Sequence, residues 1–312
     1  MENNTEKTNL RGVRYGIGAY MLWGFLPVYW KLLQEFPAGI ILANRVIWSC
    51  LFVAVLLWYK REMRVAFALF ADKKNILLVT FSSLIISLNW FTYIWAVNSG
   101  FVIQASMGYY INPLMVVLMG TLIFKEKMDK PEKIALFLAF IGVAVITLEY
   151  GRIPWVSLIL ATTFSIYGLC KRVVKVGSMV ALAIETLMIT PIALIYLAYM
   201  RQGGHFILGD INISSWLLLM GAGVVTATPL LWFAIAAQSI PFSVLGFIQY
   251  LSPTISLLLG VFLFREPFTG YHMISFSFIW AGLLLFSYVR TKKIRQSRKM
   301  LRNIEKKEKE ND

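Results

Sequence analysis

Tyr110-Ile-Asn-Pro-Leu-Met-Val-Val-Leu-Met-Gly-Thr-Leu-Ile-Phe-Lys-Glu126 recurs later in the same chain as Tyr250-Leu-Ser-Pro-Thr-Ile-Ser-Leu-Leu-Leu-Gly-Val-Phe-Leu-Phe-Arg-Glu266. The Tyr, Pro, Gly, Phe and Glu residues of the two copies coincide without a gap at an offset of 140 residues, and Lys125 aligns with Arg265. We count an odd number of membrane crossings between the copies, so the two halves of the chain are predicted to be inverted relative to each other. Inverted repeats are typical of secondary transporters, in which one half rocks against the other around a central site.

The composition is that of a membrane protein. Of the 312 residues, 58% are hydrophobic and only 15% are charged, which is too little charge to cover the surface of a soluble domain of this size. Apolar runs of roughly 17–25 residues recur along the chain, and each is long enough to cross a bilayer of ~30 Å as a helix. Since every backbone polar group in hydrocarbon needs an internal partner, we predict an all-α polytopic membrane protein.

Ten transmembrane helices are predicted, five in each of two inverted repeats. The first repeat takes residues 1–150, the second takes residues 151–290, and a basic tail occupies residues 291–312. The predicted helices are 15–33, 40–59, 75–98, 101–124, 132–149, 154–175, 179–200, 214–238, 242–264 and 271–289.

The positions of the basic residues predict the orientation of these helices. With a cytoplasmic N-terminus, 25 of the 30 Lys and Arg residues fall in cytoplasmic segments and three fall in outside segments. Short loops that are rich in Lys and Arg stay on the cytoplasmic side of a membrane. Both termini are therefore predicted to be cytoplasmic, and the basic tail is expected to lie near anionic lipid headgroups.

Several functional classes find no support in the sequence. The net charge of +14 does not indicate nucleic-acid binding, because the basic residues sit in tails and short loops between apolar runs. Cys50 and Cys170 fall in predicted helices and form no CxxC pair, and His205 and His272 lack metal-ligand spacing. No glycine-rich phosphate loop precedes a Lys-Ser or Lys-Thr pair. We therefore expect no metal, no cofactor and no enzymatic activity.

Two charged residues inside predicted helices are the first candidates for function, since burying a charge in a membrane is costly. Glu185 is the acidic residue that lies clearly inside an apolar segment, and Arg45 occupies the equivalent position of the first repeat, 140 residues earlier. They would gate the path, bind a charged group of a substrate or exchange a proton. The alternative is local compensation. Its partners would be Lys171 or Lys175 for Glu185, and Glu35, Glu149 or lipid headgroups for Arg45.

Polar and aromatic residues at helical spacing form a second set of candidates. Pro113 and Pro253, at matching positions of the repeated segment, each leave a backbone carbonyl unpaired one turn earlier and are candidate hinges. The alternative for the polar stripes is tight packing, since amides and small residues join membrane helices without any ligand. Trp30 is assigned to the interfacial aromatic belt. With Arg45 and Glu185, the full set of binding or gating candidates is Asn89, Trp90, Tyr93, Gln104, Tyr110, Asn112, Gln249, Tyr250 and Ser252.

Seven short motifs follow one another along residues 11–290. They are Tyr20-Met-Leu-Trp-Gly-Phe-Leu-Pro-Val-Tyr-Trp-Lys31, Asn44-Arg-Val-Ile-Trp-Ser49, Asn89-Trp-Phe-Thr-Tyr-Ile-Trp-Ala-Val-Asn98, Ala105-Ser-Met-Gly-Tyr-Tyr-Ile-Asn-Pro113, Tyr167-Gly168, Ile184-Glu-Thr186 and Leu245-Gly-Phe-Ile-Gln-Tyr250. Each motif is weak alone, but their order and spacing are specific. In both respects the chain resembles RarD-type permeases of the EamA family, within the drug/metabolite transporter superfamily.

The resemblance implies a fold of five plus five helices, with inverted EamA repeats and a central cavity between the halves. It also implies a bacterial inner-membrane location and the export or exchange of small metabolites or drugs. Asn44 departs from the family pattern, in which we expect His before Arg-Val-Ile-Trp-Ser. If that His carries protons in related permeases, this chain has to use another group.

We therefore interpret the chain as a secondary transporter of a small polar or amphipathic organic solute, driven by a gradient and working by alternating access. The first four helices of each repeat would line the path. The coupling ion, a proton or another ion, and a homodimeric state stay open. One alternative is a lipid-handling or scaffold subunit with an obligate partner. The other is a membrane-embedded group transferase, which would need acids or histidines clustered at one membrane face.

Overall fold

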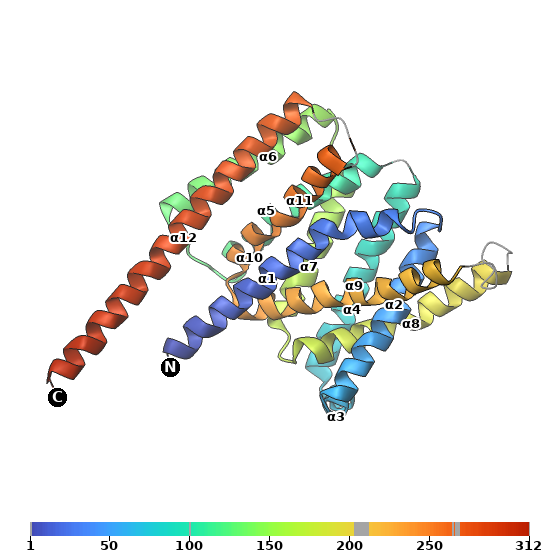
Figure 1. The fold of residues 1–312 in the computed structure, drawn as a ribbon, viewed down its shortest axis with the longest axis horizontal. Coiled ribbons are helices and arrows are strands. Elements are labelled where there is room, and N and C mark those ends of the chain that lie inside the picture. Colours follow the sequence, from blue (N-terminus) through green and yellow to red (C-terminus); the bar gives the residue numbers. More distant parts are fainter. Residues whose placement is uncertain (1, 100, 203–211, 264, 266–268, 312) are drawn as a thin grey trace. The chain divides into compact units, whose positions relative to one another are not determined.

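A computed structural model of the chain describes residues 2–99, 101–202, 212–263, 265 and 269–311. His205 and Glu266 of the sequence motifs lie outside these residues. The described residues form helices and no strand (Figure 1). The elements are α1 (Glu2–Lys31), α2 (Ala38–Tyr59), α3 (Met63–Ala68), the 3-10 turn η1 (Leu69–Ala71), α4 (Lys73–Asn98), α5 (Val102–Leu122), α6 (Lys130–Tyr150), α7 (Trp155–Val173), α8 (Ser178–Gln202), α9 (Ile213–Ser239), α10 (Phe242–Gln249), α11 (Leu251–Leu258), the π turn η3 (Leu259–Leu263) and α12 (Gly270–Asn311).

Each of the ten predicted segments coincides with helix, but one segment is interrupted. The predicted helix 242–264 is divided at Tyr250 into α10 and α11, and it ends in the π turn η3. Pro253 has no backbone N–H and leaves the carbonyl of Gln249 without its helical donor, which accounts for a break at this point. α5 runs through Pro113 without interruption. Of the two candidate hinges, only Pro253 coincides with an interruption of its helix.

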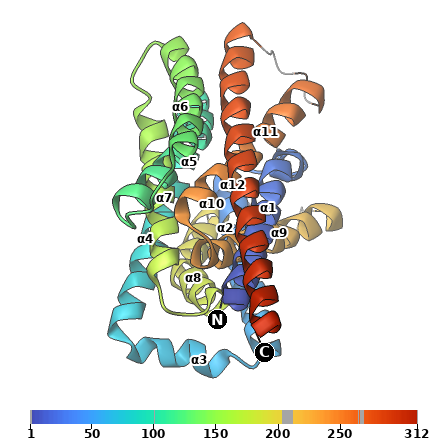
Figure 2. The same cartoon turned by 90° about the vertical axis from the view of Figure 1, so that its left-hand side faces the viewer.

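The short helix α3 was not predicted. It follows α2 in the chain and precedes η1 and α4, and it lies crosswise to α4 (Figure 2). Its side chains Val65 and Phe67 are largely exposed, and so is Arg64. Its six residues are far too few to cross a bilayer.

Nine segments within the described residues are long and apolar enough to cross a membrane. They correspond to α2, α4, α5, α6, α7, α8, α9, the combined α10–η3 segment and α12. α1, whose first half is polar and charged, is not among them. The chain is therefore a multi-pass helical membrane protein. A tenth crossing and the cytoplasmic location of the termini stay predictions from the sequence.

The helices group into two compact units that cut across the two sequence halves. Unit 1 takes residues 1–124 and 154–266, and unit 2 takes residues 125–153 and 267–312. Unit 1 thus contains the first four predicted helices of each half, whereas unit 2 contains the fifth helix of each half, α6 and α12.

The helix packing inside unit 1 has an internal symmetry. If the two halves of the chain are exchanged, α1, α2, α4 and α5 correspond to α7, α8, α9 and the α10–α11 pair. α1 packs against α9, and α7 packs against α4 in the same way. α5 packs against α7, while α10 and α11 pack against α1, and the counterparts α2 and α8 pack against each other. The packing of unit 1 is therefore pseudo-symmetric under exchange of the two halves. That the halves are inverted relative to each other stays a prediction from the sequence.

The ends of the repeated segment share an unusual backbone conformation. Lys125 has φ of 52° and Arg265 has φ of 56°, which places both residues in the left-handed region. Residues with a side chain rarely adopt this conformation, because Cβ approaches the neighbouring carbonyl oxygen. Two aligned residues with the same rare φ indicate that the two copies fold alike locally.

α2 and α9 approach each other closely at a glycine. A Cβ atom on Gly223 would lie 2.3 Å from the carbonyl carbon of Trp48 and 2.6 Å from the nitrogen of Ser49. The Ser49 hydroxyl donates to the carbonyl of Gly223 at 3.0 Å. Small residues at membrane helix contacts allow this approach, and a side-chain-to-backbone hydrogen bond adds to it.

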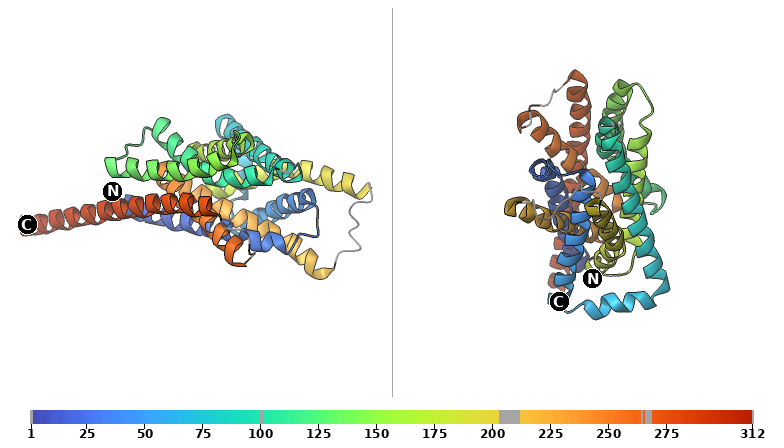
Figure 3. Two further views of the ribbon diagram at one scale, coloured as in Figure 1. Left: turned by 90° about the horizontal axis from the view of Figure 1, so that it is seen from above. Right: turned by 90° about the vertical axis from the view of Figure 1, so that its right-hand side faces the viewer.

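Unit 2 consists of α6 and the long continuous helix α12, which lie alongside each other (Figure 3). α6 starts with a capping box of Asp129 and Glu132. Lys293 contacts both carboxylates, at 2.6 Å and 3.1 Å, and Arg290 lies 2.9 Å from Glu132. Hydrogen bonding from Lys293 lowers the pKa of Asp129 below its usual value. Arg290, just before the predicted tail, and Lys293, within it, thus join α12 to α6.

Replacing Gly223 with valine is expected to destabilise the protein, because the new side chain would collide with the backbone of α2. Overpacking costs about 1–3 kcal/mol, so Tm should fall when detergent-purified protein is unfolded by heat. Gly177→Ala is the matched control, since no described atom lies within 4 Å of a Cβ at Gly177. Equal melting temperatures of the two variants would contradict the close packing of α2 on α9.

Candidate functional site

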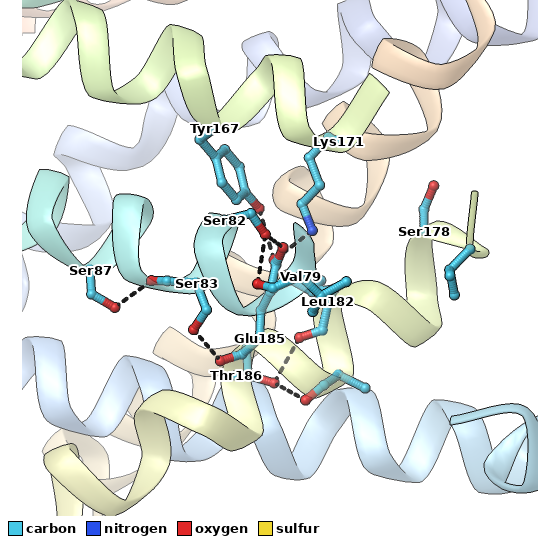
Figure 4. Close-up of polar contacts among 12 residues, drawn as sticks. Val79, Ser82, Ser83, Ser87, Tyr167, Lys171, Ser178, Leu182, Glu185 and Thr186 are labelled. Atoms are coloured by element: carbon cyan, nitrogen blue, oxygen red, sulfur yellow. Dashed lines mark hydrogen bonds and ion pairs between the residues drawn. The ribbon is translucent and has the colours of Figure 1, made fainter. Parts of the chain in front are cut away.

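Glu185 on α8 accepts hydrogen bonds from three side chains on two other helices (Figure 4). Lys171 Nζ on α7 lies 2.5 Å from Glu185 Oε2, and the Tyr167 hydroxyl donates to the same oxygen at 3.3 Å. The Ser82 hydroxyl on α4 donates to Glu185 Oε1. We call these four residues the Glu185 network, and it links α4, α7 and α8.

The Glu185 network is closed to solvent and electrically neutral. The exposed fraction is 2% for Glu185 and 1% for Lys171. The ammonium neutralises the carboxylate and two hydroxyls occupy further lone pairs, which is what a buried ion pair needs to offset its desolvation. The charge of Glu185 is therefore compensated locally, by Lys171. Lys171 is a buried residue in the last turn of α7.

Arg45 on α2 lies among aromatic side chains from three other helices. Its guanidinium carbon is 4.6 Å from the ring centre of Trp30 on α1 and 5.7 Å from that of Trp90 on α4. Tyr93 on α4 and Tyr109 on α5 lie close enough to interact with its charge. The rings of these two tyrosines meet at a steep angle, with centres 6.3 Å apart. Arg45 thus lies near the rings of two tryptophans, and two tyrosines are within electrostatic range.

A fifth helix completes the surroundings of Arg45. Its Nε donates to Thr226 Oγ1 on α9 at 2.9 Å. No carboxylate of unit 1 forms an ion pair with Arg45 among the described residues, and Glu35 instead accepts a hydrogen bond from Ser215 at 2.6 Å. We call the set of Arg45, Trp30, Trp90, Tyr93, Tyr109 and Thr226 the arginine cage.

The two charges are therefore compensated in different ways. A charge at the centre of a membrane helix costs at least about 2.5–3.5 kcal/mol. A cation–π contact returns about 0.5–2 kcal/mol, so two of them offset much of this cost. Aromatic rings and a threonine carry no negative charge, however, and the arginine cage keeps its net charge of +1. The Glu185 network has no net charge.

The two charges lie at helix contacts that correspond under exchange of the halves. Arg45 is at the contact of α2 with α9, and Glu185 is at the contact of α8 with α4. Each contact also has a hydrogen bond from a serine hydroxyl to a backbone carbonyl. Ser49 donates to the Gly223 carbonyl in the first contact, and Ser83 donates to the Glu185 carbonyl in the second. In the predicted topology the first contact faces outward and the second faces the cytoplasm, so we call them the outer and the inner contact.

Three of the predicted amide candidates are used in bonds to α7. Asn89 Nδ2 donates to the Leu160 carbonyl at 2.9 Å, and Asn112 Nδ2 donates to the Ala161 carbonyl at 2.8 Å. Gln104 Oε1 accepts from the backbone N–H of Val156 at 3.0 Å, in the first turn of α7. These bonds join α4 and α5 to α7, and they favour the packing alternative for Asn89, Gln104 and Asn112.

The remaining candidates lie on α5 and along α10 and α11. Tyr110 is half-buried on α5, and Ser252 is half-buried on α11. Gln249 Oε1 and the Tyr250 hydroxyl are buried without a hydrogen-bond partner in the described part of the chain. Unpartnered polar atoms at this depth are unusual, and they lie at the break between α10 and α11.

Three members of the arginine cage were missed by the sequence analysis. Thr226 and Tyr109 carry no signal of their own, since a threonine and a tyrosine in an apolar helix are ordinary. Trp30 was assigned to the interfacial belt, but it stacks on Arg45. The motif Tyr20–Lys31 did contain Trp30, although nothing in it indicates a contact with α2. The described residues contain no group of three or more His, Cys, Asp or Glu that would hold a metal.

Comparison with known proteins identifies the family. The model of the EamA-like transporter family matches the chain twice, over residues 10–148 and 153–288. The uncharacterized transporter YojE of Bacillus subtilis is 45% identical over 292 residues, covering 92% of this chain and 97% of that protein. Protein RarD of Salmonella typhi is 39% identical over 280 residues, covering 90% and 95%.

The fold also has a counterpart among solved structures. One crystal structure superposes with a TM-score of 0.69 at 17% identity, covering 90% of this chain and 98% of that one. At this identity the likeness concerns the fold alone. The two family matches span most of the chain, and the relatives are aligned over nearly their full length. The chain therefore belongs to the EamA-like transporter family.

Proposed function

We propose that the protein moves a small organic solute across the bacterial inner membrane by alternating access, driven by a gradient. The observation that carries this proposal is the placement of Arg45 and Glu185. Opposite charges lie at two helix contacts that exchange when the halves are exchanged, and two such related contacts are suited to ends that open in turn. Membership of a family of transporters supports the same function.

The inner contact acts as a gate in this proposal. The Glu185 network links α8 to α4 and α7, so the cytoplasmic end can open only if its bonds are exchanged or broken. A bistable element of this kind is what a transporter needs for two discrete states. Protonation of Glu185 or competition by a solute would weaken the bond to Lys171.

A solute screen tests the proposed function itself. Detergent-purified protein is heated with amino acids, nucleosides, organic acids and chloramphenicol-like drugs, and each hit is then assayed for flux into proteoliposomes. A ligand that binds only the folded state raises Tm with its concentration. We expect at least one saturable hit that is also transported. A well-folded protein without any hit would favour the lipid-handling or scaffold alternative.

Removing one charge of the Glu185 network should cost more stability than removing both. Lys171→Met or Glu185→Gln alone leaves a buried charge without its partner, at a cost of about 3–5 kcal/mol. In the double variant Lys171→Met/Glu185→Gln the amide oxygen can accept from Ser82 and the amide NH2 can donate to the Tyr167 hydroxyl, so its Tm should lie near that of the wild type. Thermal unfolding of the four proteins gives the comparison.

The same double variant separates gating from packing. If the ion pair gates the inner contact, transport of the solute found in the screen should fall by about tenfold, which corresponds to about 1.4 kcal/mol. Wild-type flux in a double variant of wild-type stability would show that the pair only holds the helices together.

Cross-linking the inner contact should stop transport. Thr80 Oγ1 on α4 lies 3.5 Å from Met188 Sδ on α8, so Thr80→Cys/Met188→Cys places two thiols at this contact. Cys50→Ala and Cys170→Ala remove the native thiols. Flux into proteoliposomes is measured after treatment with a short, reducible thiol cross-linker, and we expect it to stop and to return on reduction. Each single-cysteine variant, treated alike, is the control. Undiminished flux in the fully cross-linked protein would mean that α4 and α8 do not separate.

A further inference from the structure

We propose that the arginine cage binds the carboxylate of a small, flat organic anion, and that anions of this class are the solutes carried. The inference rests on the transport function proposed above and names its substrate class. It is carried by an unneutralised guanidinium on α2 that side chains of four other helices surround.

The charge selects an anion. Arg45 keeps a net positive charge because its neighbours are aromatic rings and one threonine, whereas Glu185 is neutralised by Lys171 at 2.5 Å. The aromatic faces make the guanidinium tolerable inside the membrane, and they leave its attraction for an anion intact. A cation would meet electrostatic repulsion at the same place.

The geometry selects a carboxylate. Nε of Arg45 is held by Thr226, which fixes the plane of the guanidinium. Neither terminal nitrogen forms a hydrogen bond within the described part of unit 1. A planar guanidinium with free terminal N–H groups is suited to a carboxylate, which can accept two parallel hydrogen bonds.

The rings select a flat ligand. The rings of Trp30 and Trp90 lie near the guanidinium, and residues Tyr93 and Tyr109 are 38% and 54% exposed. Aromatic side chains bind planar groups by stacking and edge-to-face contacts, and a tyrosine hydroxyl adds a hydrogen bond. The ring of a planar acid can therefore lie against the tyrosines while its carboxylate reaches Arg45.

The arginine cage lies between helices, and not on the lipid-facing surface of a single helix. Members of the arginine cage come from α1, α2, α4, α5 and α9, which include helices of both repeats. A point that five helices share lies between them. A solute bound there would touch both halves of the outer contact, since Arg45 is on α2 and Thr226 is on α9.

Three isosteric probes test the proposal by charge alone. Benzoate, benzamide and benzamidinium share the flat ring and nearly the same outline, and they carry charges of −1, 0 and +1. Binding to the full-length protein in a neutral detergent is measured at pH 7.5 by thermal shift and by tryptophan fluorescence. Because charge-assisted bonds are the stronger ones, we expect benzoate to bind at least about tenfold more tightly than the other two. Cyclohexanecarboxylate, which is charged but not flat, should bind more weakly than benzoate.

Variants of Arg45 show whether this side chain binds the carboxylate of benzoate. Arg45→Gln should weaken benzoate binding by about tenfold or more and leave benzamide unchanged, while Arg45→Lys should keep part of the preference for the anion. Arg64→Gln, at an exposed arginine on α3, is the matched control for the loss of one positive charge. Trp90→Leu should weaken benzoate more than cyclohexanecarboxylate.

Several results would overturn the proposal. It fails if the three probes bind alike, if no probe binds to well-folded protein, or if Arg45→Gln leaves the affinity for benzoate unchanged. It also fails if phosphatidylglycerol, but not benzoate, stabilises the protein in an Arg45-dependent manner, because Arg45 would then hold a lipid headgroup.

Failure of the anion-site proposal can be distinguished from failure of the proposed transport function. Flux of a neutral or cationic solute that does not depend on Arg45 would leave a transporter but remove its proposed substrate class. Arg45-dependent binding of benzoate in a protein that carries no solute would leave the anion site but remove the proposed transport function.

Discussion

The constraint on which the rest of the structure depends is the cost of a net charge inside the membrane. The protein meets this cost in two ways. At Glu185 it supplies a counter-charge, Lys171, and two hydroxyl donors, so that α4, α7 and α8 are held together by a neutral cluster. At Arg45 it supplies aromatic faces and a threonine, which lower the cost without removing the charge. The first arrangement is complete in itself, and in the second we propose that a bound anion supplies the counter-charge.

The surroundings of Arg45 and Glu185 are related by the internal symmetry of unit 1. The α2–α9 and α8–α4 contacts correspond when the halves are exchanged, and each holds one charge of opposite sign. A solute that neutralises Arg45 changes the outer contact. Through α2 and α8, which pack against each other, it can bias the inner contact, provided that it binds the two states with different affinities. We propose that this difference couples solute binding to the exchange of access.

Much of the fold was predictable because its signals are local. Apolar runs predicted the positions of the helices, and the repeat at Tyr110 and Tyr250 predicted which helices of the two halves are equivalent. The burial of Glu185 followed from its apolar neighbours. Contacts between distant segments left no such signal. Trp30 was read as an interfacial residue, and nothing in the sequence joined Tyr109 or Thr226 to Arg45. The amides Asn89, Gln104 and Asn112 look alike in sequence whether they line a cavity or pack, and their bonds to α7 favour packing. The grouping of α6 with α12 depends on packing that periodicity does not encode.

The most direct test of alternating access measures both contacts in one protein in lipid nanodiscs. Spin labels at the exposed Lys74 and Lys175 report on the inner end, where Asn75 accepts from the Lys175 N–H, and labels at the exposed Gln34 and Ile213 report on the outer end. Continuous-wave and pulsed EPR then give the two distance distributions for the wild type, Lys171→Met and Arg45→Gln. We expect Lys171→Met to lengthen the inner distance while the outer distance stays short, and Arg45→Gln to do the reverse. Distances that stay unchanged, or that lengthen together, would contradict two gates that open in turn.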